Sequence, residues 1–375
     1  MPDRPNFVIV HTDQQRADCL GLHGHPELVT PNLDQLGASG ADFRQAYTTA
    51  PVCSPARRSI LTGRGPATDG CLDNSPVRTP HPEDTLPNLF KRTGYQTADI
   101  GRGFHQHPDG ARYGFEVVEA SPFHAHDSRV HREIGRASSK GQFSNWPHLL
   151  NHGLALDGYA ARAWPYSEDF HQTTWTVNKA IEYLDRRDGE TPFLLSVGFV
   201  APHPPLVPPG FYFDRYHRMD LTPPAVGDWA EAPANNAIGL GQTGRYIPHG
   251  REELRSAMAA YYGLIDHVDD MLHNLLVRLN LCRQPTYILF CSDHGEQLGD
   301  HYLFRKAQPY QGSTHIPFLL KGPEIPERTV VDEIVCLEDI LPTFCHLANI
   351  EVPDHVEGRS LLPLLRGDPG GWRSY

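Results

Sequence analysis

Short apolar runs, rich in branched side chains, recur along the chain and are each followed by polar or glycine-rich sequence. Three of them, at 6–11 (NFVIVH), 191–200 (TPFLLSVGFV) and 286–291 (TYILFC), lack regular alternation with polar residues. Such runs are typical of strands buried on both faces of a parallel or mixed sheet. A fourth strand is predicted at 95–100, directly after Gly94.

Apolar residues spaced by three and four positions predict helices between these strands. The longest is expected at 251–281, where apolar residues repeat at alternating steps of four and three. Shorter helices are expected at 85–93, 169–184 and 335–349, and another opens at the Thr-Pro pair 30–31. Strands that alternate with helices indicate an α/β fold. At 375 residues, the chain can form one large domain or two to three smaller ones.

Charge and cysteine content narrow the classes of partner. The chain has 33 basic and 45 acidic residues, a net charge of −12, which argues against binding to nucleic acid or to an anionic membrane. No apolar run approaches the roughly 18 to 20 residues that cross a bilayer. Residues 1–5 lead straight into the first strand, so no signal peptide is visible and a cytoplasmic location is expected. The 7 cysteines form no C-x-x-C pair, which favours reduced thiols.

Acidic and imidazole side chains follow two of the predicted strands. Asp13 and Gln14 come after the first strand, and Asp293 and His294 after the strand at 286–291. Because ligands of open α/β sheets bind at the carboxyl ends of the strands, Asp13, Asp293 and His294 predict a cation site. Mostly oxygen ligands favour Ca²⁺, while the imidazole leaves Mn²⁺ or Mg²⁺ open. The structural alternative for Asp13 is a helix cap or turn.

The stretch at 52–64 (VCSPARRSILTGR) carries the most specific pattern in the chain. Cys53 lies at the start of a predicted short helix that ends at Gly63, with Arg57 and Arg58 beside it. Amide groups at a helix start, together with arginines, favour an anion. A buried structural cysteine is the alternative for Cys53 considered alone.

The pattern C-x-P-x-R followed by x-x-[IL]-L-T-G resembles the signature of the type I sulfatases, arylsulfatase-like members of the alkaline phosphatase superfamily. In that family the cysteine is oxidised after translation to Cα-formylglycine. Motifs in the family's order run from Asn6 to about Leu365. The resemblance implies an alkaline-phosphatase-like mixed sheet flanked by helices, with the catalytic domain at 1–350. Residues 351–375 would begin a C-terminal segment whose usual small subdomain is expected to be truncated or absent.

The resemblance also assigns roles to residues outside the cysteine motif, and it adds Gln14 to Asp13, Asp293 and His294 as a cation ligand. Residues 101–105 (GRGFH) stand where sulfatases carry G-K-x-x-H, so Arg102 replaces a lysine that contacts the sulfate, and His105 acts close by. Arginine keeps the positive charge but cannot donate a proton. His203, in the PHPP segment at 202–205, matches a histidine bonded to the sulfate or to the leaving oxygen, and is the general-acid candidate. Lys306 matches a second sulfate-binding lysine.

The implied reaction is hydrolysis of a sulfate monoester to an alcohol and inorganic sulfate. Formylglycine at Cys53, itself also a cation ligand, is hydrated to a diol, and one of its oxygens attacks sulfur. Arg57, the other cationic side chains and the cation neutralise the oxyanion, and His203 protonates the leaving alcohol. His105 then helps to deprotonate the second hydroxyl, which expels sulfate. The implied partners are a small-molecule or saccharide sulfate ester and the formylglycine-generating enzyme.

Two other functions remain open at this stage. One is a phosphonate monoester or phosphodiester hydrolase of the same superfamily, since glutamine at the position of Gln14 occurs there too. The other is a catalytically silent anion-binding protein whose cysteine is never modified. The polar, histidine-rich stretch at 107–165 is expected to shape the substrate pocket, and a second metal site there is a further alternative.

Overall fold

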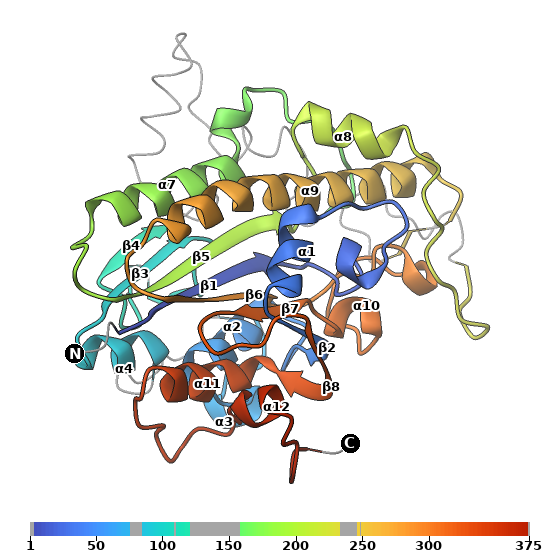
Figure 1. Ribbon diagram of the computed structural model, residues 1–375. Coiled ribbons are helices and arrows are strands. Elements are labelled where there is room, and N and C mark those ends of the chain that lie inside the picture. Colours follow the sequence, from blue (N-terminus) through green and yellow to red (C-terminus); the bar gives the residue numbers. More distant parts are fainter. Residues whose placement is uncertain are drawn as a thin grey trace.

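A mixed sheet of eight strands forms the centre of the protein (Figure 1). The computed structural model describes residues 4–75, 85–108, 110–120, 158–232, 246–247 and 249–373. The strand order is β4-β3-β5-β1-β6-β7-β2-β8, and β7 alone among these strands runs antiparallel to its neighbours. The strands are β1 (Asn6–Asp13), β2 (Ala41–Tyr47), β3 (Gln96–Gly101), β4 (Val117–Ala120), β5 (Phe193–Pro202), β6 (Thr286–Ser292), β7 (Phe318–Lys321) and β8 (Thr329–Cys336).

Strand β1 shows why the central runs are apolar without alternation. Phe7 and Ile9 pack into the core on one face of the sheet, whereas Val8 and Val10 pack into the core on the other. Successive side chains of a strand point to opposite faces, so a strand covered on both faces needs apolar residues at every position. The predicted strands at 6–11, 95–100, 191–200 and 286–291 are confirmed as β1, β3, β5 and β6.

Helices cover both faces of the sheet in two layers (Figure 1). The long helix predicted at 251–281 is confirmed as α9. It shares one layer with three others: α1 (Pro31–Ala38), α7 (Gln172–Arg186), α8 (Gly210–His217) and α9 (Glu252–Asn280). The opposite layer contains α2 (Cys53–Thr62), α3 (Pro66–Asp69), α4 (Leu86–Arg92), α11 (Ile340–Leu347) and α12 (Leu362–Leu365). The remaining short helical elements are α10 (Gln311–Thr314), η1 (Gly21–His23), η3 (Glu168–Phe170), η4 (Asp300–Tyr302) and η5 (Leu337–Asp339).

The start of α1 is fixed by a side chain from α9. The carboxylate of Asp269 accepts hydrogen bonds from the backbone amides of Asn32 at 3.1 Å and Leu33 at 2.7 Å. Thr30 is the N-cap residue, as predicted, but its hydroxyl does not cap the helix. The capping group comes instead from far along the sequence, and it joins the two helices of one layer.

The helix predicted at 335–349 begins later in the structure than the sequence indicated. Val335 and Cys336 end strand β8, which pairs in parallel with β2, and α11 starts only at Ile340 after the turn η5. The run at 329–336 (TVVDEIVC) is rich in branched residues, which favour a strand, and pairing with β2 outweighs the apolar spacing that continues into the helix. The helix predicted at 169–184 is likewise shifted, to α7 at Gln172–Arg186.

Several strands were not predicted at all: β2, β4, β7 and β8. Most of the histidine-rich stretch expected to shape the pocket, residues 121–157, lies outside the described residues. Among the helices of the described part, none combines the length and the apolar character needed to cross a bilayer. All 7 cysteines are unpaired, in agreement with the expected reduced thiols.

Candidate active site

Two adjacent strands deliver the acidic residues predicted for the cation site. Strands β1 and β6 are parallel neighbours, with Thr12 opposite Ser292 in the register. Asp13 ends β1 and Asp293 directly follows β6, so both carboxylates lie at the same edge of the sheet. Both residues are fully buried. The expectation that they meet at the carboxyl edge therefore agrees with the geometry.

Helix α2 places Cys53 against these residues. Cys53 is the first residue of the helix, and Asn74 accepts a hydrogen bond from the backbone amide of Ser54 at 2.9 Å. The Sγ atom of Cys53 lies 3.2 Å from Nε2 of His294 and 3.7 Å from Oδ1 of Asp13. Asn74 thus binds the helix start that carries the cysteine, which gives this loop asparagine a structural role beside the site.

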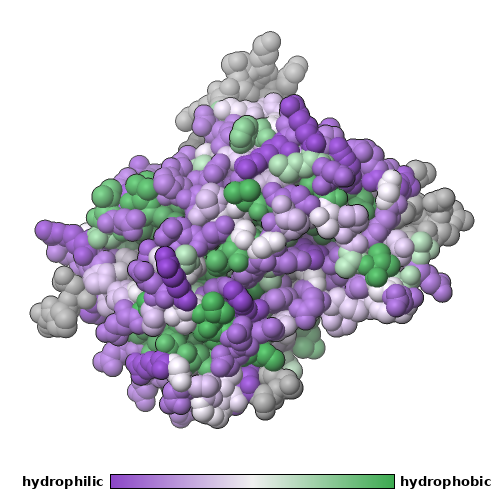
Figure 2. Space-filling view, turned by 45° about the vertical axis from the view of Figure 1, so that its right-hand side comes forward, coloured by the Kyte–Doolittle hydropathy of each residue, from purple (hydrophilic) through white to green (hydrophobic). Residues whose placement is uncertain are grey.

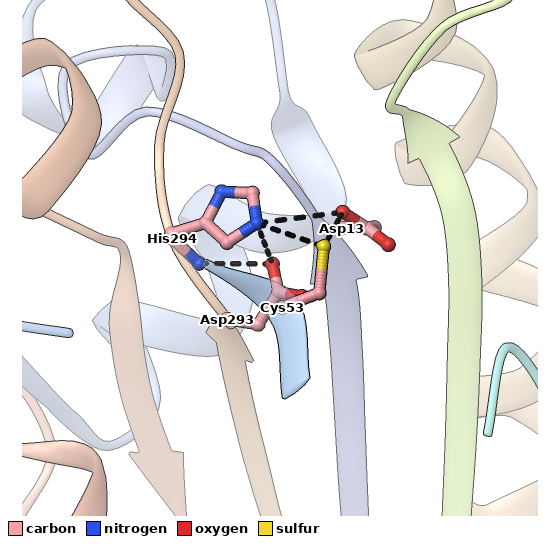
Figure 3. A group of neighbouring side chains, drawn as sticks. All are labelled: Asp13, Cys53, Asp293 and His294. Atoms are coloured by element: carbon pink, nitrogen blue, oxygen red, sulfur yellow. Dashed lines mark hydrogen bonds and ion pairs between the residues drawn. The ribbon is translucent and has the colours of Figure 1, made fainter. Parts of the chain in front are cut away.

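Asp13, Cys53, Asp293 and His294 converge from three separate segments of the chain (Figure 3). Each offers one ligand atom, and these atoms all lie within 4.8 Å of one another. Two carboxylate oxygens, an imidazole nitrogen and the position of the cysteine side chain form a donor set that a divalent cation can occupy. The buried group is therefore a candidate metal centre.

Gln14 contributes a further observation in favour of a cation. Its backbone has φ of 77°, in the left-handed region that non-glycine residues rarely adopt, and its N–H donates to Oδ1 of Asp293 at 3.1 Å. Its side-chain Nε2 donates to Glu296, while its Oε1 is buried and has no hydrogen-bond partner among the described residues. A buried amide oxygen without a partner is costly unless a ligand binds it. The residues present therefore fit a hard cation.

Two buried arginines neutralise the strand-end carboxylates. Arg57 Nε donates to Oδ2 of Asp293 at 2.8 Å, and another of its nitrogens lies 3.2 Å from Oδ2 of Asp13. Arg102 Nε donates to the same oxygen of Asp13 at 2.7 Å. Both side chains are nearly inaccessible to solvent. Arg102, at the position where lysine was expected, is thus directly joined to the candidate metal ligand Asp13.

Lys306 supplies a third cation next to the cysteine. Its Nζ lies 2.9 Å from Sγ of Cys53 and 3.9 Å from Oδ1 of Asp13. Although burial opposes it, interaction with Cys53 and Asp13 raises the pKa of Lys306, so the ammonium is charged at neutral pH. Three cationic side chains therefore gather around the two strand-end carboxylates and Cys53, in a chain of net charge −12.

The charges around Cys53 and Asp13 shift their protonation. Burial and Asp13 oppose ionisation of the Cys53 thiol, but Lys306 and His294 outweigh them and lower its pKa to about 6. Burial likewise opposes ionisation of Asp13, yet Arg102 and the other cations hold its pKa well below the usual range. An unmodified Cys53 would accordingly be a thiolate at neutral pH.

The predicted histidines His203 and His105 interact electrostatically with the charged groups of the site. Burial, followed by Lys306, holds the pKa of His203 well below its usual range, and Nδ1 of this ring lies 2.7 Å from the carbonyl oxygen of Pro204. Burial and Arg102 lower the pKa of His105 in the same way. Both imidazoles are therefore neutral in the unliganded site, and the proton of His203 is on Nδ1.

Sequence reasoning missed several residues that support the site. Glu296 contacts Gln14, and its motif, SDHGEQLGDH at 292–301, could have pointed to it. Behind Arg57 lies His11, whose Nε2 is 3.2 Å from the hydroxyl of Ser196. Asp99, on the adjacent strand β3, is paired in register with Ser196. His11, Ser196 and Asp99 lie on three different strands, and the strand order β3-β5-β1 brings them together.

Comparison with known proteins identifies the family. The profile of the family described as Sulfatase matches residues 5–350, nearly the whole catalytic domain predicted from the sequence. The chain belongs to the sulfatase family. It is accordingly a hydrolase of sulfuric esters, as the motif around Cys53 implied.

Individual relatives agree with this assignment. The arylsulfatase of Clostridium perfringens is 37% identical over 395 residues, which cover 99% of this sulfatase and 80% of that protein. The multifunctional alkaline phosphatase superfamily protein of Trinickia caryophylli is 30% identical, with 99% and 79% covered. Among solved structures, the phosphonate monoester hydrolase of Agrobacterium radiobacter matches with a TM-score of 0.83 at 27% identity, again with 99% and 79% covered. The predicted alkaline-phosphatase-like fold is confirmed.

Proposed function

We propose that this sulfatase hydrolyses a sulfate monoester to an alcohol and inorganic sulfate, with a formylglycine derived from Cys53 as its nucleophile. The observation that carries the proposal is the position of Cys53 at a helix start, within hydrogen-bonding distance of both Lys306 and His294. In the mature enzyme, Sγ marks the place of the oxygens of the hydrated aldehyde. A formylglycine-generating enzyme would be needed to produce that aldehyde.

The cation site is proposed to comprise Asp13, Gln14, Asp293, His294 and the modified residue 53. Its mostly oxygen ligands favour Ca²⁺, with Mn²⁺ and Mg²⁺ as alternatives. When bound, the cation would supply positive charge to the sulfuryl oxygens and favour ionisation of the attacking hydroxyl. The unpartnered oxygen of Gln14 and the convergent carboxylates support this assignment.

Charge stabilisation by the protein falls to Arg57, Arg102 and Lys306. Negative charge develops on the sulfuryl oxygens during attack, and preorganised cations in a buried site stabilise it more strongly than they would in water. Arg57 and Arg102 are fixed by their carboxylate partners, so they need little reorganisation. Lys306 is the cation nearest to the nucleophile and is proposed to contact the sulfate directly.

Proton transfer is proposed to use the two histidines in opposite senses. Without substrate, His203 is neutral because burial and Lys306 lower its pKa. An anionic ester bound beside it would raise that pKa, so His203 would carry a second proton only in the substrate complex and donate it to the leaving alcohol. Neutral His105 is suited to accept a proton from the second hydroxyl of the diol, which then expels sulfate and regenerates the aldehyde.

The substrate is proposed to be an aryl sulfate or a related small-molecule or saccharide ester, because an arylsulfatase is 37% identical over nearly the whole chain. A phosphonate monoester is the second candidate, since a hydrolase of such esters matches with a TM-score of 0.83. Measuring kcat/KM for an aryl sulfate, choline sulfate, sugar sulfates and a phenyl phosphonate ester distinguishes the two. A sulfate ester is expected to be the best substrate, and a clear preference for the phosphonate ester would replace this proposal with the second one.

A further inference from the structure

Gln14 has a side chain with two chemically different ends. The amide presents an NH₂ group, which only donates hydrogen bonds, and an oxygen, which accepts them or binds a cation. The backbone around it is fixed: its N–H donates to Asp293, and its carbonyl accepts from the hydroxyl of Tyr261 at 2.7 Å. Which end of the amide faces the cation site therefore depends on what the other end contacts.

Glu296 determines that contact. This residue is almost completely buried, and its Oε1 accepts hydrogen bonds from two backbone amides, those of Leu298 (3.0 Å) and Arg305. Its remaining oxygen, Oε2, accepts from Nε2 of Gln14. One carboxylate oxygen of Glu296 thus faces two backbone N–H donors, and the other faces the NH₂ group of Gln14. The NH₂ end of Gln14 is thus held by Glu296, and Oε1 of Gln14 is left without a partner among the described residues.

We propose that Glu296 is a positioning residue that fixes the orientation of the Gln14 amide so that its oxygen, and not its NH₂ group, is offered to the divalent cation. The inference rests on the cation site of the proposed function and adds a residue to it. Supporting residues behind metal ligands change metal affinity by about 10- to 100-fold when they are altered.

The geometry makes the effect of Glu296→Gln specific. The new amide must keep its oxygen toward the amides of Leu298 and Arg305, because an NH₂ group there would face two other donors. Its own NH₂ group then faces Gln14, whose amide must rotate to accept that hydrogen bond. The rotation would turn the NH₂ end of Gln14 toward the cation, although the side chain at 296 has nearly the same size.

The test is calorimetric titration of the full chain, freed of metal by a chelator, with Ca²⁺ as the probe. Glu296→Gln is expected to weaken Ca²⁺ binding by about 10- to 100-fold while the circular dichroism spectrum stays native. Asp269→Asn is the matched control, because Asp269 is also a buried carboxylate that accepts from two backbone amides and from a side-chain amide, that of Asn32 at 2.9 Å. The control should leave Ca²⁺ affinity unchanged.

Making Glu296→Gln in a Gln14→Glu protein tests whether Glu296 acts by orienting the side chain at position 14 or by a general structural effect. In Gln14→Glu, the new carboxylate can accept from the NH₂ group that Glu296→Gln introduces and still offer an oxygen to the cation. The double variant Gln14→Glu/Glu296→Gln is therefore expected to bind Ca²⁺ at least as tightly as Gln14→Glu alone. This pair also carries the test if Glu296→Gln alone does not fold.

Three results would overturn the inference. One is Glu296→Gln with wild-type affinity, which would mean that Glu296 does not determine the orientation of the Gln14 amide. Another is an equal loss of Ca²⁺ affinity when Glu296→Gln is made in the wild-type protein and in Gln14→Glu. That result would show that Glu296 stabilises the structure without orienting the amide of Gln14. The third is a wild-type chain that binds none of Ca²⁺, Mn²⁺ and Mg²⁺. That result would first remove the cation site of the proposed function, so the two failures are distinguishable.

Discussion

Arg102 is the residue at which this chain leaves the pattern of its family, and its contacts suggest why arginine serves there. Its Nε is joined to Asp13 at 2.7 Å, so the side chain orients a candidate cation ligand and also adds positive charge. Arg102→Ala is expected to lose about 2 to 4 kcal/mol of transition-state stabilisation, the scale of losing one oxyanion donor. The loss is measured from kcat/KM for a sulfate ester whose aryl group carries no charge. Arg102→Lys should keep most of the activity. An alanine variant with unaltered kcat/KM would remove Arg102 from the site.

His203 should reveal its role through the leaving group. A general acid contributes roughly 10²- to 10⁴-fold, and it contributes most when the departing alcohol is a poor leaving group. His203→Ala is therefore expected to lower kcat/KM strongly for an alkyl sulfate and only weakly for 4-nitrophenyl sulfate. The ratio of the two losses is the measurement. Equal losses on both esters would show that His203 binds the sulfate group without donating the proton.

Asp293 tests the cation site without the substrate. Asp293→Asn keeps the size of the side chain, and Arg57 retains Asp13 as an anionic partner, so the fold should survive. Alanine would be less informative, because removing one partner of a buried ion pair destabilises a protein by about 3 to 5 kcal/mol. Metal content measured by mass spectrometry is expected to fall while the circular dichroism spectrum stays native. Unchanged metal occupancy in the variant would contradict the assignment of Asp293 as a ligand.

The strand-end and motif residues could be predicted because the sequence alone shows their positions. They directly follow a buried strand or belong to a specific pattern, such as the one around Cys53. Glu296 and Asp99 were not predicted. Their importance comes from burial and from partners far away in the sequence, as in the contact of Glu296 with Gln14. The motif at 292–301 contains Glu296, but spacing along the chain does not show which distant residue it contacts.

At the scale of the element, strand β3 contains a buried acid beside the site. Burial raises the pKa of Asp99 from 3.8 to about 6, against the opposing effect of hydrogen bonds from Ser196 and Gln106. An ionised Asp99 therefore destabilises the folded protein above pH 6, and this penalty disappears as the pH falls toward 4. The shift corresponds to about 3 kcal/mol at most.

Asp99→Asn is accordingly expected to stabilise the protein by about 1 to 3 kcal/mol at pH 7.5, where the wild-type carboxylate is ionised. The gain should shrink between pH 6 and pH 4. Urea unfolding of both proteins at several pH values provides the measurement. A gain that does not change with pH would show that burial of the charge is not its cause.

The strands predicted from the sequence are those buried on both faces, such as β1 and β6, because a short continuous apolar run between turn residues is typical of a buried strand. Strands β7 and β8 were both missed, and the last two residues of β8 were assigned to a helix. Strand β8 is partly exposed and β7 has four residues, so neither has a distinct periodicity. Their pairing with β2 is a property of the sheet, and the segments by themselves do not encode it.

At the scale of the whole molecule, the fold gathers cationic side chains at one site although the chain has a net negative charge. The face in Figure 2 is largely hydrophilic, with hydrophobic residues in several separate patches. The net charge is −12, yet Arg57, Arg102 and Lys306 meet at the carboxyl edge of the sheet. A local cationic site of this kind attracts a small anion without making the protein a general polyanion binder. The cytoplasmic location and the limits of the catalytic domain stay predictions.

The central claim, that formylglycine at position 53 performs the reaction, is tested most directly by mass spectrometry of the tryptic peptide containing Cys53. Preparations made with graded amounts of a formylglycine-generating enzyme should contain graded fractions of the aldehyde in place of the thiol. Aryl sulfatase activity per mole of protein is expected to rise in proportion to that fraction and to vanish with it. Cys53→Ser, which has one hydroxyl and cannot form a diol, should release no more than a trace of sulfate. Full activity in a preparation whose Cys53 is entirely unmodified would contradict the account.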